Sequence, residues 1–435
     1  MRVLVLGSGP TGLLTGAALA ERGHEVTAVD RDPGPETDGT WRRRGVMQFE
    51  HAHGFRPQVA EVLQRRWPAA HDEWLDAGAE PMTMEVPGAG TRNIGNRSRR
   101  SVLERALRSA AAPTPGLALQ VGHVDGLLAA DGRVTGAVVE KVPVTADLVV
   151  DASGRSSRID RTTDPELEGL CGLAYVDRTY QLLPGAGPGP MDNPLGSFSG
   201  YDGYQVLLFL HEAGHFSVLF VCPTADDALR PLRFDPVFDE ACRAVPALAA
   251  WTDPDRARPT GSVMVGGALR NVYRPQRGLA GLVSVGDTVA TTTPTRGRGV
   301  AMAFLQVDAL LRLLDDGADA GTVAEPFGAW CDELIRPWVE DHLAIDSEAV
   351  ARWQGAPLDL TRPLSTERIC EAAQADPRIS DHTGPYFAMT ALPSCLGPAE
   401  TLARAVYETG WRAPYAVGPS RDQLVDLVQR GRLDR

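Results

Sequence analysis

The sequence is poor in lysine and lacks the cysteine and histidine patterns of several protein classes. Lys141 is the only lysine among 43 basic residues, so a reaction that needs a Schiff-base or proton-donating lysine must use this residue. The 6 cysteines are scattered without a C-x-x-C spacing, which argues against a disulfide framework or a zinc site and favours a reducing cytoplasm. His51 and His53 form a close pair with no further cluster of ligand-type residues nearby, so no metal site is expected.

Long apolar runs and excess positive charge are also missing. No run approaches the roughly 18 apolar residues that mark a membrane-spanning helix. The net charge of -13 argues against nucleic acid or an anionic membrane surface as a partner. The length of 435 residues favours two or three lobes. The expectation is therefore a cytoplasmic protein that binds neither membranes nor nucleic acids.

The first thirty residues have the pattern of a dinucleotide-binding unit. An apolar run at 3–6 leads into G-S-G-P-T-G at 7–12, and a helix-forming stretch and a second apolar run at 25–29 follow. In such a unit the glycines permit a tight turn, close approach of a pyrophosphate and packing of the helix on the strand. The amides at the helix start then face the phosphates. Asp30 ends the second run, 18 residues past Gly12, where it can accept hydrogen bonds from a ribose.

A second motif begins at Gly281 and reads GLVSVGDTVATTTPTRGRGVAMAFLQVDALLRLL. A buried-type strand at 282–285 delivers Gly286 and Asp287 at its carboxyl end, and helical periodicity follows at 300–314. Asp287 can hydrogen-bond the hydroxyls of a sugar-like chain. A helix that starts at 299–300 offers backbone amides and a positive dipole to an electron-rich ring edge.

Together these motifs resemble those of the FAD-dependent aromatic hydroxylase and epoxidase superfamily, related in fold to p-hydroxybenzoate hydroxylase and more distantly to styrene monooxygenase. The segment 100–104 matches its R-x-x-L-E helix start, and 146–154 matches its apolar strand that ends in an acid. The segment 42–54 resembles an R-x-G-V-x-Q-x-x-x-x-H-G stretch of actinobacterial members. The FAD contacts that the resemblance implies are Gly7, Gly9, Pro10, Thr11, Gly12, Asp30, Arg31, Arg43, Gln48, Arg100, Val124, Asp151, Gly286, Asp287, Pro294, Gly297, Arg298, Gly299 and Val300.

The resemblance implies an α/β fold with three parts. These are a Rossmann-like FAD-binding domain of glutathione-reductase type (1–166 and 267–350), an inserted antiparallel-sheet substrate domain (167–266) and a helical C-terminal extension (351–435). The extension is expected to pack on the flavin lobe. Within the inserted domain the alternation of apolar residues predicts strands at 173–183, 204–210 and 215–221, a turn at 211–214 and a helix at 234–250. The run 80–86 is expected to add a strand to this sheet, and the loop 184–196 is either a lid or an exposed connection.

The chemistry implied is oxygen insertion into a small organic substrate of the secondary-metabolite type. FAD would be reduced, react with O2 to a flavin hydroperoxide, and transfer one oxygen atom to the substrate as a hydroxylation or epoxidation. The candidate catalytic residues are His53, Thr292 and Thr293, although a structural role is the commoner one for such a histidine. Arg298, between two motif glycines, could favour negative charge at the flavin pyrimidine edge.

The source of electrons and the reaction type have alternatives. Members that use NAD(P)H directly usually have Asp-Gly after the middle strand, whereas this chain has D-A-S-G at 151–154, so a separate flavin reductase is the alternative to NAD(P)H. Halogenases of this fold need a lysine between flavin and substrate and usually carry W-x-W-x-I-P. No two of the 8 tryptophans are two residues apart, and Lys141 follows a strand-like run at 134–139, away from the expected lysine position. A saturating reductase of the geranylgeranyl type, a dehydrogenase, or a non-enzymatic flavoprotein are the remaining alternatives.

Overall fold

A five-stranded parallel sheet forms the centre of the larger lobe in the computed structural model, which describes residues 1–43, 45–86, 90–157, 159, 164–191, 196–276 and 279–433. The strand order is β18-β9-β1-β2-β5, and every pairing in it is parallel. Because the strands are parallel, the two glycine motifs and the acid-terminated middle strand leave the sheet at the same edge. The strands are β1 (Arg2–Leu6), β2 (Glu25–Asp30), β5 (Leu117–Val121), β9 (Leu148–Asp151) and β18 (Leu282–Ser284).

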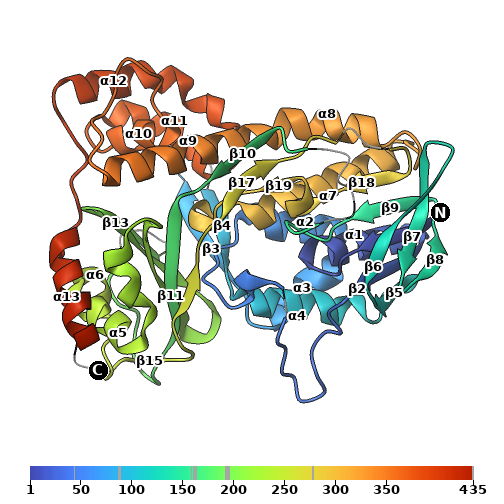
Figure 1. The fold of residues 1–435 in the computed structure, drawn as a ribbon, viewed down its shortest axis with the longest axis horizontal. Coiled ribbons are helices and arrows are strands. Elements are labelled where there is room, and N and C mark those ends of the chain that lie inside the picture. The colour runs from blue at the N-terminus through green and yellow to red at the C-terminus, as the bar shows by residue number, and fades with distance from the viewer. Residues whose placement is uncertain are drawn as a thin grey trace.

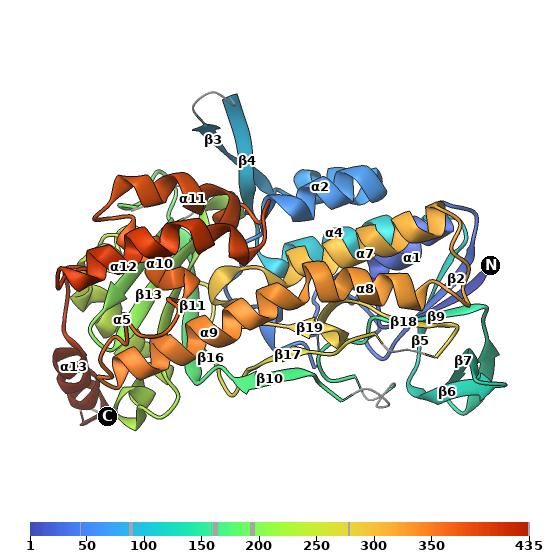
Figure 2. The ribbon, with the colours of Figure 1, turned by 90° about the horizontal axis from the view of Figure 1, so that it is seen from above.

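The parallel sheet is covered on both faces, which explains why its inner strands β1 and β9 are almost entirely apolar and buried. A three-stranded antiparallel sheet packs on one face, where Leu4 and Leu6 of β1 meet Val134 and Val139. Helices pack on the opposite face, as Figure 2 shows for α1 and α7. These covering elements are β6 (Val124–Ala130), β7 (Arg133–Val139), β8 (Val142–Thr145), α1 (Pro10–Ala20), α4 (Arg100–Ala111), α7 (Gly299–Asp315) and α8 (Ala324–Leu334).

The second lobe is a six-stranded antiparallel sheet, seen edge-on beside the first lobe in Figure 1. Alternate residues of its central strand β11 face opposite sides, so that Val176 and Tyr180 pack against helices while Leu173 and Tyr175 belong to a separate cluster on the other face. The predicted strands at 173–183, 204–210 and 215–221 are present. The elements of this lobe are β11 (Leu173–Leu182), β12 (Gly196–Tyr201), β13 (Tyr204–Leu210), β14 (His215–Pro223), β15 (Ala257–Pro259), β16 (Met264–Gly266), η2 (Glu212–Gly214), η3 (Asp227–Arg233), α5 (Asp235–Ala244) and α6 (Pro246–Ala249).

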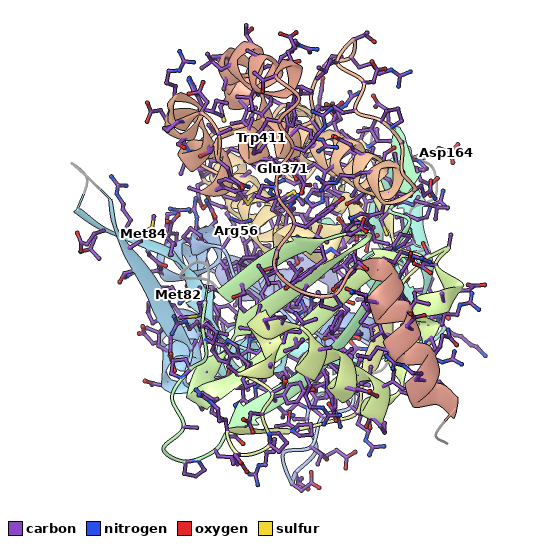
Figure 3. The ribbon with its side chains drawn as sticks, turned by 90° about the vertical axis from the view of Figure 1, so that its left-hand side faces the viewer. Arg56, Met82, Met84, Asp164, Glu371 and Trp411 are labelled. Carbon is purple, nitrogen blue, oxygen red and sulfur yellow. The ribbon has the colours of Figure 1, made fainter. Side chains whose placement is uncertain are left out.

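Two expectations about local structure are wrong. The helix expected at 234–250 is broken between α5 and α6, because Pro246 cannot continue a helix and restarts a new one instead. The strand expected to join the substrate sheet, β3 (Glu80–Val86), pairs with the adjacent β4 (Gly90–Arg97) as a separate ribbon. Figure 2 shows this ribbon projecting from the body, and Met84, labelled in Figure 3, is 44% exposed on it.

A small antiparallel sheet and two helices complete the connections around the two lobes. The sheet is built of β10 (Leu167–Leu170), β17 (Arg270–Tyr273) and β19 (Ala290–Thr291), and the helices are α2 (Pro57–Arg66) and α3 (Pro68–Asp76). The predicted loop 184–196 is described only to residue 191, where Trp251 Nε1 donates to the Pro190 carbonyl at 2.8 Å. Residues 192–195 lie outside the described residues.

The C-terminal extension packs on the larger lobe, as expected, and its last helix also reaches the second lobe. Its first helices add Ile369, Tyr386 and Tyr407 to the core of the larger lobe. Its last helix crosses to the second lobe, where Leu424 and Val428 are fully buried against α5. No helix of the described residues is both long and apolar enough to cross a membrane. The helices of this part are α9 (Arg336–Trp353), α10 (Thr366–Ala372), α11 (Pro377–Phe387), η6 (Pro393–Ala399), α12 (Glu400–Glu408) and α13 (Arg421–Leu433).

Candidate functional site

The three glycines of the first motif meet different surroundings. Gly7 has a φ of +102°, and a Cβ there would lie 2.6 Å from the Ala152 carbonyl oxygen. A Cβ at Gly12 would lie 1.9 Å from the carbonyl oxygen of Gly7, so the fold itself requires both glycines. At Gly9 the nearest atom to a Cβ is an Arg43 nitrogen at 3.8 Å. The protein leaves room at Gly9, and the start of α1 presents its unpaired amides there, which is the arrangement that admits a phosphate.

Acidic and basic residues from three segments meet beside this turn. Asp30 accepts hydrogen bonds from the backbone amides of Ser8 at 2.8 Å and Asp32 at 3.0 Å, and Arg43 lies 3.4 Å from it. Arg43 also forms a buried ion pair with Glu104, whose carboxylate accepts from Arg100 Nε at 2.6 Å. Arg43 and Arg100, both predicted FAD contacts, therefore share one fully buried carboxylate next to the turn, an arrangement suited to an anionic ligand.

The second motif packs directly on the first. Gly286 has a φ of +73°, and a Cβ there would lie 3.0 Å from Thr11 Oγ1. The half-buried Asp287 follows, and no described residue donates a hydrogen bond to its carboxylate. Burial raises the pKa of Asp287, and the Arg100 and Arg155 guanidinium groups partly counter this effect. A carboxylate without a donor is an available acceptor for a ligand hydroxyl.

The loop before α7 contains the other predicted cofactor contacts. Gly297 ends the short 3-10 turn Pro294–Arg296 (η5) in a left-handed conformation with a φ of +61°. Nothing in the described chain lies within 4 Å of a Cβ built at Gly299, where α7 begins. The first amides of α7, at 299 and 300, lack helical partners and face no protein cap. The Thr292 hydroxyl is buried without a partner among the described residues, so it too is available to a ligand.

Three predicted contacts are engaged with protein groups. Asp151 is fully buried and accepts hydrogen bonds from the Ser153 hydroxyl at 2.6 Å and the Ser157 hydroxyl at 2.7 Å. Thr293 and Arg298 are almost completely buried and bind α9. Asp151 and Thr293 are thus held by protein groups, whereas Arg298 keeps Nε and Nη2 buried without a partner among the described residues. The expected contacts of all three with FAD or oxygen stay predictions.

For the remaining candidates the contacts do not decide a role. Pro10 begins α1, Val124 begins β6 and Pro294 is exposed at the start of η5. Arg31 is exposed, and Gln48 is half-buried in the short 3-10 turn η1 (Met47–Phe49). Their cofactor contacts stay predictions.

The two neighbouring histidines differ in their surroundings. His53 contacts the His51 carbonyl oxygen through Nδ1 at 2.9 Å and faces Arg100 through Nε2, and burial and Arg100 lower its pKa to about 3. His53 is therefore neutral and held by the protein, which favours a structural role. His51 instead places Nδ1 2.5 Å from the fully buried carboxylate of Asp177 on β11, and the second oxygen of Asp177 accepts from the Ala52 amide at 2.9 Å.

The sequence argument missed the His51–Asp177 pair. A charged residue inside the otherwise half-apolar strand predicted at 173–183 was the available signal, since a buried carboxylate needs a partner. Which partner it has depends on how the two lobes meet, and no spacing in the sequence encodes that.

A cavity of about 470 Å³ lies where the lobes meet at this pair. Its walls combine aromatic and apolar side chains with two arginines, a glutamate and His51. The Arg43 side chain connects it to the glycine turn described above. The lining residues are Trp41, Arg42, Arg43, Val46, Met47, Phe49, Glu50, His51, Met264 and Val265.

Comparisons with known sequences identify the first segment. Residues 1–63 match the family described as FAD binding domain. A D-amino acid dehydrogenase of Rhizobium johnstonii is 43% identical over 67 residues, which cover 15% of this chain and 16% of that protein. The same enzyme of Sinorhizobium medicae is 41% identical over 67 residues, with the same coverage of 15% and 16%. The chain thus matches about a sixth of the length of these curated relatives.

Solved structures resemble the whole chain. The flavin-dependent brominase Bmp2 superimposes with a TM-score of 0.60 at 14% identity, covering 94% of this chain and 99% of that one. PqsL, a probable FAD-dependent monooxygenase from Pseudomonas aeruginosa, gives a TM-score of 0.59 at 14% identity, covering 82% and 100%. The myxobacterial chondrochloren halogenase CndH gives 0.58 at 15% identity, covering 97% and 98%.

At these identities the likeness establishes the fold. The chain shares its fold with these flavin-dependent enzymes, and its first 63 residues match the FAD binding domain family.

Proposed function

We propose that this protein is an FAD-dependent monooxygenase that inserts one oxygen atom from O2 into a small organic substrate. The observation that carries the proposal is that the two glycine motifs meet beside a cavity between the lobes. Each motif contains one glycine, Gly9 or Gly299, that the packing of the protein itself does not require. Gly9, Arg43 and Arg100 would hold the diphosphate of FAD, Asp30 its ribose, and Asp287 its ribityl chain. Bound FAD would supply the redox chemistry that activates O2.

The residues of the cavity would position the substrate. Trp41 and Phe49 line the cavity, and the exposed Arg42 at its rim suits a substrate with an acidic group. Asp177 fixes the His51 imidazole through Nδ1, which leaves Nε2 to accept or return a proton at the substrate. This pair replaces His53 as the proposed acid–base group.

The proposed electron source is NAD(P)H or a separate flavin reductase. The Asp151 carboxylate, whose segment departs from the Asp-Gly pattern, is fully buried and binds Ser153 and Ser157. It is therefore not free to help a nicotinamide. Stopped-flow bleaching of the flavin band measures this directly, and we expect slow reduction by NADPH alone.

Isotope-labelled O2 tests the oxygen insertion. Purified protein with FAD, a generic flavin reductase and NADH is incubated with a panel of small aromatic metabolites under labelled O2, and products are weighed by mass spectrometry. We expect one labelled oxygen atom in the product. Product formation that continues without O2 would instead assign a reductase or dehydrogenase and overturn the proposal.

Halogenation is the alternative that two of the similar structures suggest, and the position of the lysine opposes it. Lys141 lies in the exposed turn between β7 and β8, where its backbone amide donates to Asp125 at 2.7 Å. Figure 1 shows this turn at the end of the molecule away from the antiparallel lobe. Lys141→Met should leave product formation unchanged in buffer with chloride and bromide. Loss of activity in soluble, FAD-loaded variant protein, or a halogen mass in the wild-type product, would favour the halogenase.

A further inference from the structure

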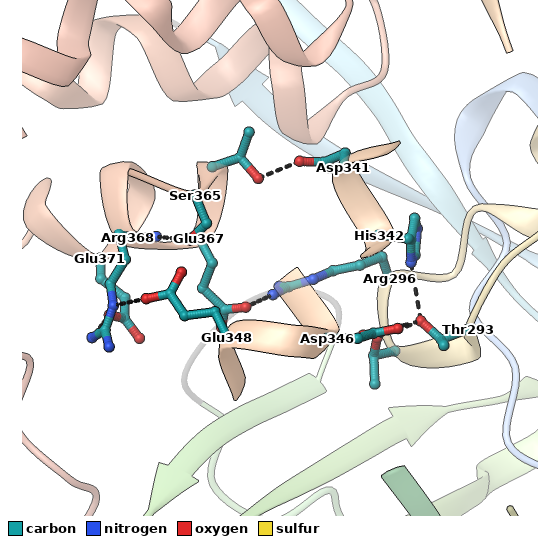
Figure 4. A network of polar contacts seen from close by, with 12 residues as sticks. Thr293, Arg296, Asp341, His342, Asp346, Glu348, Ser365, Glu367, Arg368 and Glu371 are labelled. Atoms are coloured by element: carbon teal, nitrogen blue, oxygen red, sulfur yellow. Dashed lines mark hydrogen bonds and ion pairs between the residues drawn. The ribbon is translucent and has the colours of Figure 1, made fainter. Parts of the chain in front are cut away.

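The cofactor loop, defined as residues 293–299, is held in place by helices that follow residue 335. Three of its side chains, Thr293, Arg296 and Arg298, each bind a residue of α9 or α10. Figure 4 shows the contacts of Thr293 and Arg296 within the larger polar network that surrounds them. None of these contacts involves the strand–turn–helix motif that defines the family, and each depends on helices beyond residue 335.

Arg298 is the most deeply buried member of the loop. Its guanidinium group is 0% exposed and donates to Asp341 Oδ2 at 2.7 Å. It also lies 4.4 Å from the ring centroid of Trp338 and 4.6 Å from that of Tyr386, distances at which a cation is attracted by an aromatic face. The Tyr386 hydroxyl donates to Asp341 at 2.8 Å, so side chains of α9 and α11 enclose the Arg298 guanidinium group together.

Arg296 ties the loop to α10 and to the start of α2. Its side chain pairs with Glu367 of α10. Its carbonyl oxygen accepts from Arg56 Nη2 at 2.6 Å, and Arg56 Nη1 donates to the Phe387 carbonyl oxygen at the end of α11 at 2.5 Å. Arg296 thus connects the loop to α10, and Arg56 connects the loop to the start of α2 and to the end of α11.

Thr293 anchors the beginning of the loop to α9. Its amide donates to Asn271 Oδ1 at 2.8 Å, and its hydroxyl lies 3.0 Å from His342 Nδ1. The Asn271 amide group donates to Asp346 at 2.7 Å. Burial and the nearby Arg298, Arg296 and Arg56 guanidinium groups hold the pKa of His342 well below its usual range, so the imidazole is neutral.

The charges in this cluster balance. Its three arginines (Arg56, Arg296 and Arg298) stand against three carboxylates (Asp341, Asp346 and Glu367). In a buried cluster, removing one partner leaves the other charge without compensation, which is far more costly than losing a surface ion pair. The loop conformation therefore depends on the docking of α10 and α11.

We infer that α10 and α11 form a clamp on the cofactor loop, with Glu367 and Tyr386 as positioning residues that set the affinity for FAD without touching it. The inference rests on the proposed function only in taking FAD as the ligand of this loop. If an undocked clamp releases the loop, the apparent affinity falls in proportion to the clamped fraction. Linkage is reciprocal, so FAD must also strengthen the docking of the clamp by the same factor.

The experiment compares matched variants of the full-length apoprotein. Glu367→Gln removes the partner of Arg296, whereas Glu371→Gln, on the same helix, removes a carboxylate that pairs with Arg352 and Arg368 and does not touch the loop. Titration with FAD, followed by quenching of flavin fluorescence, should give a dissociation constant about tenfold higher for Glu367→Gln. Glu371→Gln should match the wild type.

A second pair keeps the test independent of charge. Tyr386→Phe loses the hydroxyl that donates to Asp341 but keeps the ring, and Tyr407→Phe loses a comparably buried hydroxyl whose acceptor is the Arg368 carbonyl oxygen. Only Tyr386→Phe should weaken FAD binding. A double-mutant cycle of Arg296→Ala with Glu367→Gln should be strongly non-additive in FAD affinity, a result that general loss of stability does not produce.

Hydrogen exchange supplies the reciprocal readout. FAD should slow amide exchange across 366–388 in the wild type and to a smaller degree in Glu367→Gln. Equal FAD affinity in Glu367→Gln and Glu371→Gln, or exchange across 366–388 that FAD leaves unchanged, overturns the clamp while the proposed function stands. Failure of the wild type to bind FAD overturns both.

Discussion

Gly9 and Gly12 stand three residues apart in one turn, yet they differ in how much space the fold leaves for a side chain. A Cβ at Gly12 would collide with the Gly7 carbonyl oxygen at 1.9 Å, whereas a Cβ at Gly9 has 3.8 Å to its nearest neighbour. Gly9 also has a φ of -72°, which any residue adopts. The structure therefore separates a glycine that folding needs from one that only a ligand needs.

Gly9→Val should abolish FAD binding and leave the apoprotein as stable as the wild type, because its side chain would occupy the space of the pyrophosphate. Gly12→Val should destabilise the apoprotein itself. Thermal unfolding of both apoproteins and FAD titration of Gly9→Val provide the check. Wild-type FAD affinity in Gly9→Val would remove this turn from the cofactor site.

At the same scale, His51 is the side chain whose replacement should affect turnover alone. His51→Gln keeps a neutral hydrogen-bonding side chain of similar size but cannot take up a proton. With a substrate in hand, kcat should fall by about 10²- to 10⁴-fold at unchanged FAD content, the range for loss of a general acid or base. His71→Gln is the matched control, since His71 lies 3.4 Å from Asp72 on α3 and does not line the cavity. Equal turnover of the two variants would exclude the acid–base role.

At the scale of elements, the last helix is bound to the lobe opposite the rest of the extension. Arg421 at its start pairs with Asp226 at 2.7 Å, and Leu424 and Val428 are fully buried in the core of the antiparallel lobe. The Tyr204 hydroxyl donates to the Pro419 carbonyl oxygen at 2.7 Å just before it. The C-terminal extension therefore connects the two lobes, because its earlier helices pack on the larger lobe and α13 packs on the antiparallel lobe.

Leu424→Ala should destabilise the antiparallel lobe by about 2–5 kcal/mol, since it leaves a cavity in a packed core. FAD affinity should stay at the wild-type value because α13 contacts neither glycine motif. Denaturant unfolding gives the free energy of unfolding, and Asp426→Ala on the exposed side of the same helix is the control. A change below about 1 kcal/mol, as for surface positions, would show that α13 is not part of that core.

At the scale of the whole molecule, buried neutral histidines make stability depend on pH. His211 is 4% exposed with Nε2 2.8 Å from the Ser217 hydroxyl, and burial and Arg99 lower its pKa to about 3. A histidine in the unfolded chain titrates near 6.5. Below that pH, His211 is protonated in the unfolded state but stays neutral in the folded state. The free energy of unfolding therefore falls as the pH falls from about 6.5 toward 3. Asp346, whose pKa burial raises to about 6, acts with the opposite sign.

His211→Gln should remove one such contribution. Between pH 7 and pH 5 the wild type should lose roughly 2 kcal/mol more of its free energy of unfolding than the variant, from the size of the pKa difference. Denaturant unfolding at both pH values measures the difference. Identical pH dependence in the two proteins would mean that His211 is protonated in the folded state.

The sequence by itself determined the parts of the protein whose physics is local. A glycine turn, the apolar strand before it and the helix after it are contiguous, so the first strand–turn–helix–strand unit, the R-x-x-L-E helix start and the helix after Gly299 are all where the motifs predict them. Strand alternation likewise predicted β11, β13 and β14, because each strand faces a core on at least one side.

Only the tertiary structure decided what depends on contacts between distant segments. Alternation at 80–86 shows a strand but not its partner, and the strand paired locally instead of joining the larger sheet. His51 and Asp177 are 126 residues apart, so their pairing follows from how the lobes dock. Arg298 sits between motif glycines in the chain, yet its long side chain turns away into α9 and α11. Local spacing fixes backbone conformation, whereas the direction and partner of a long or charged side chain are fixed by burial.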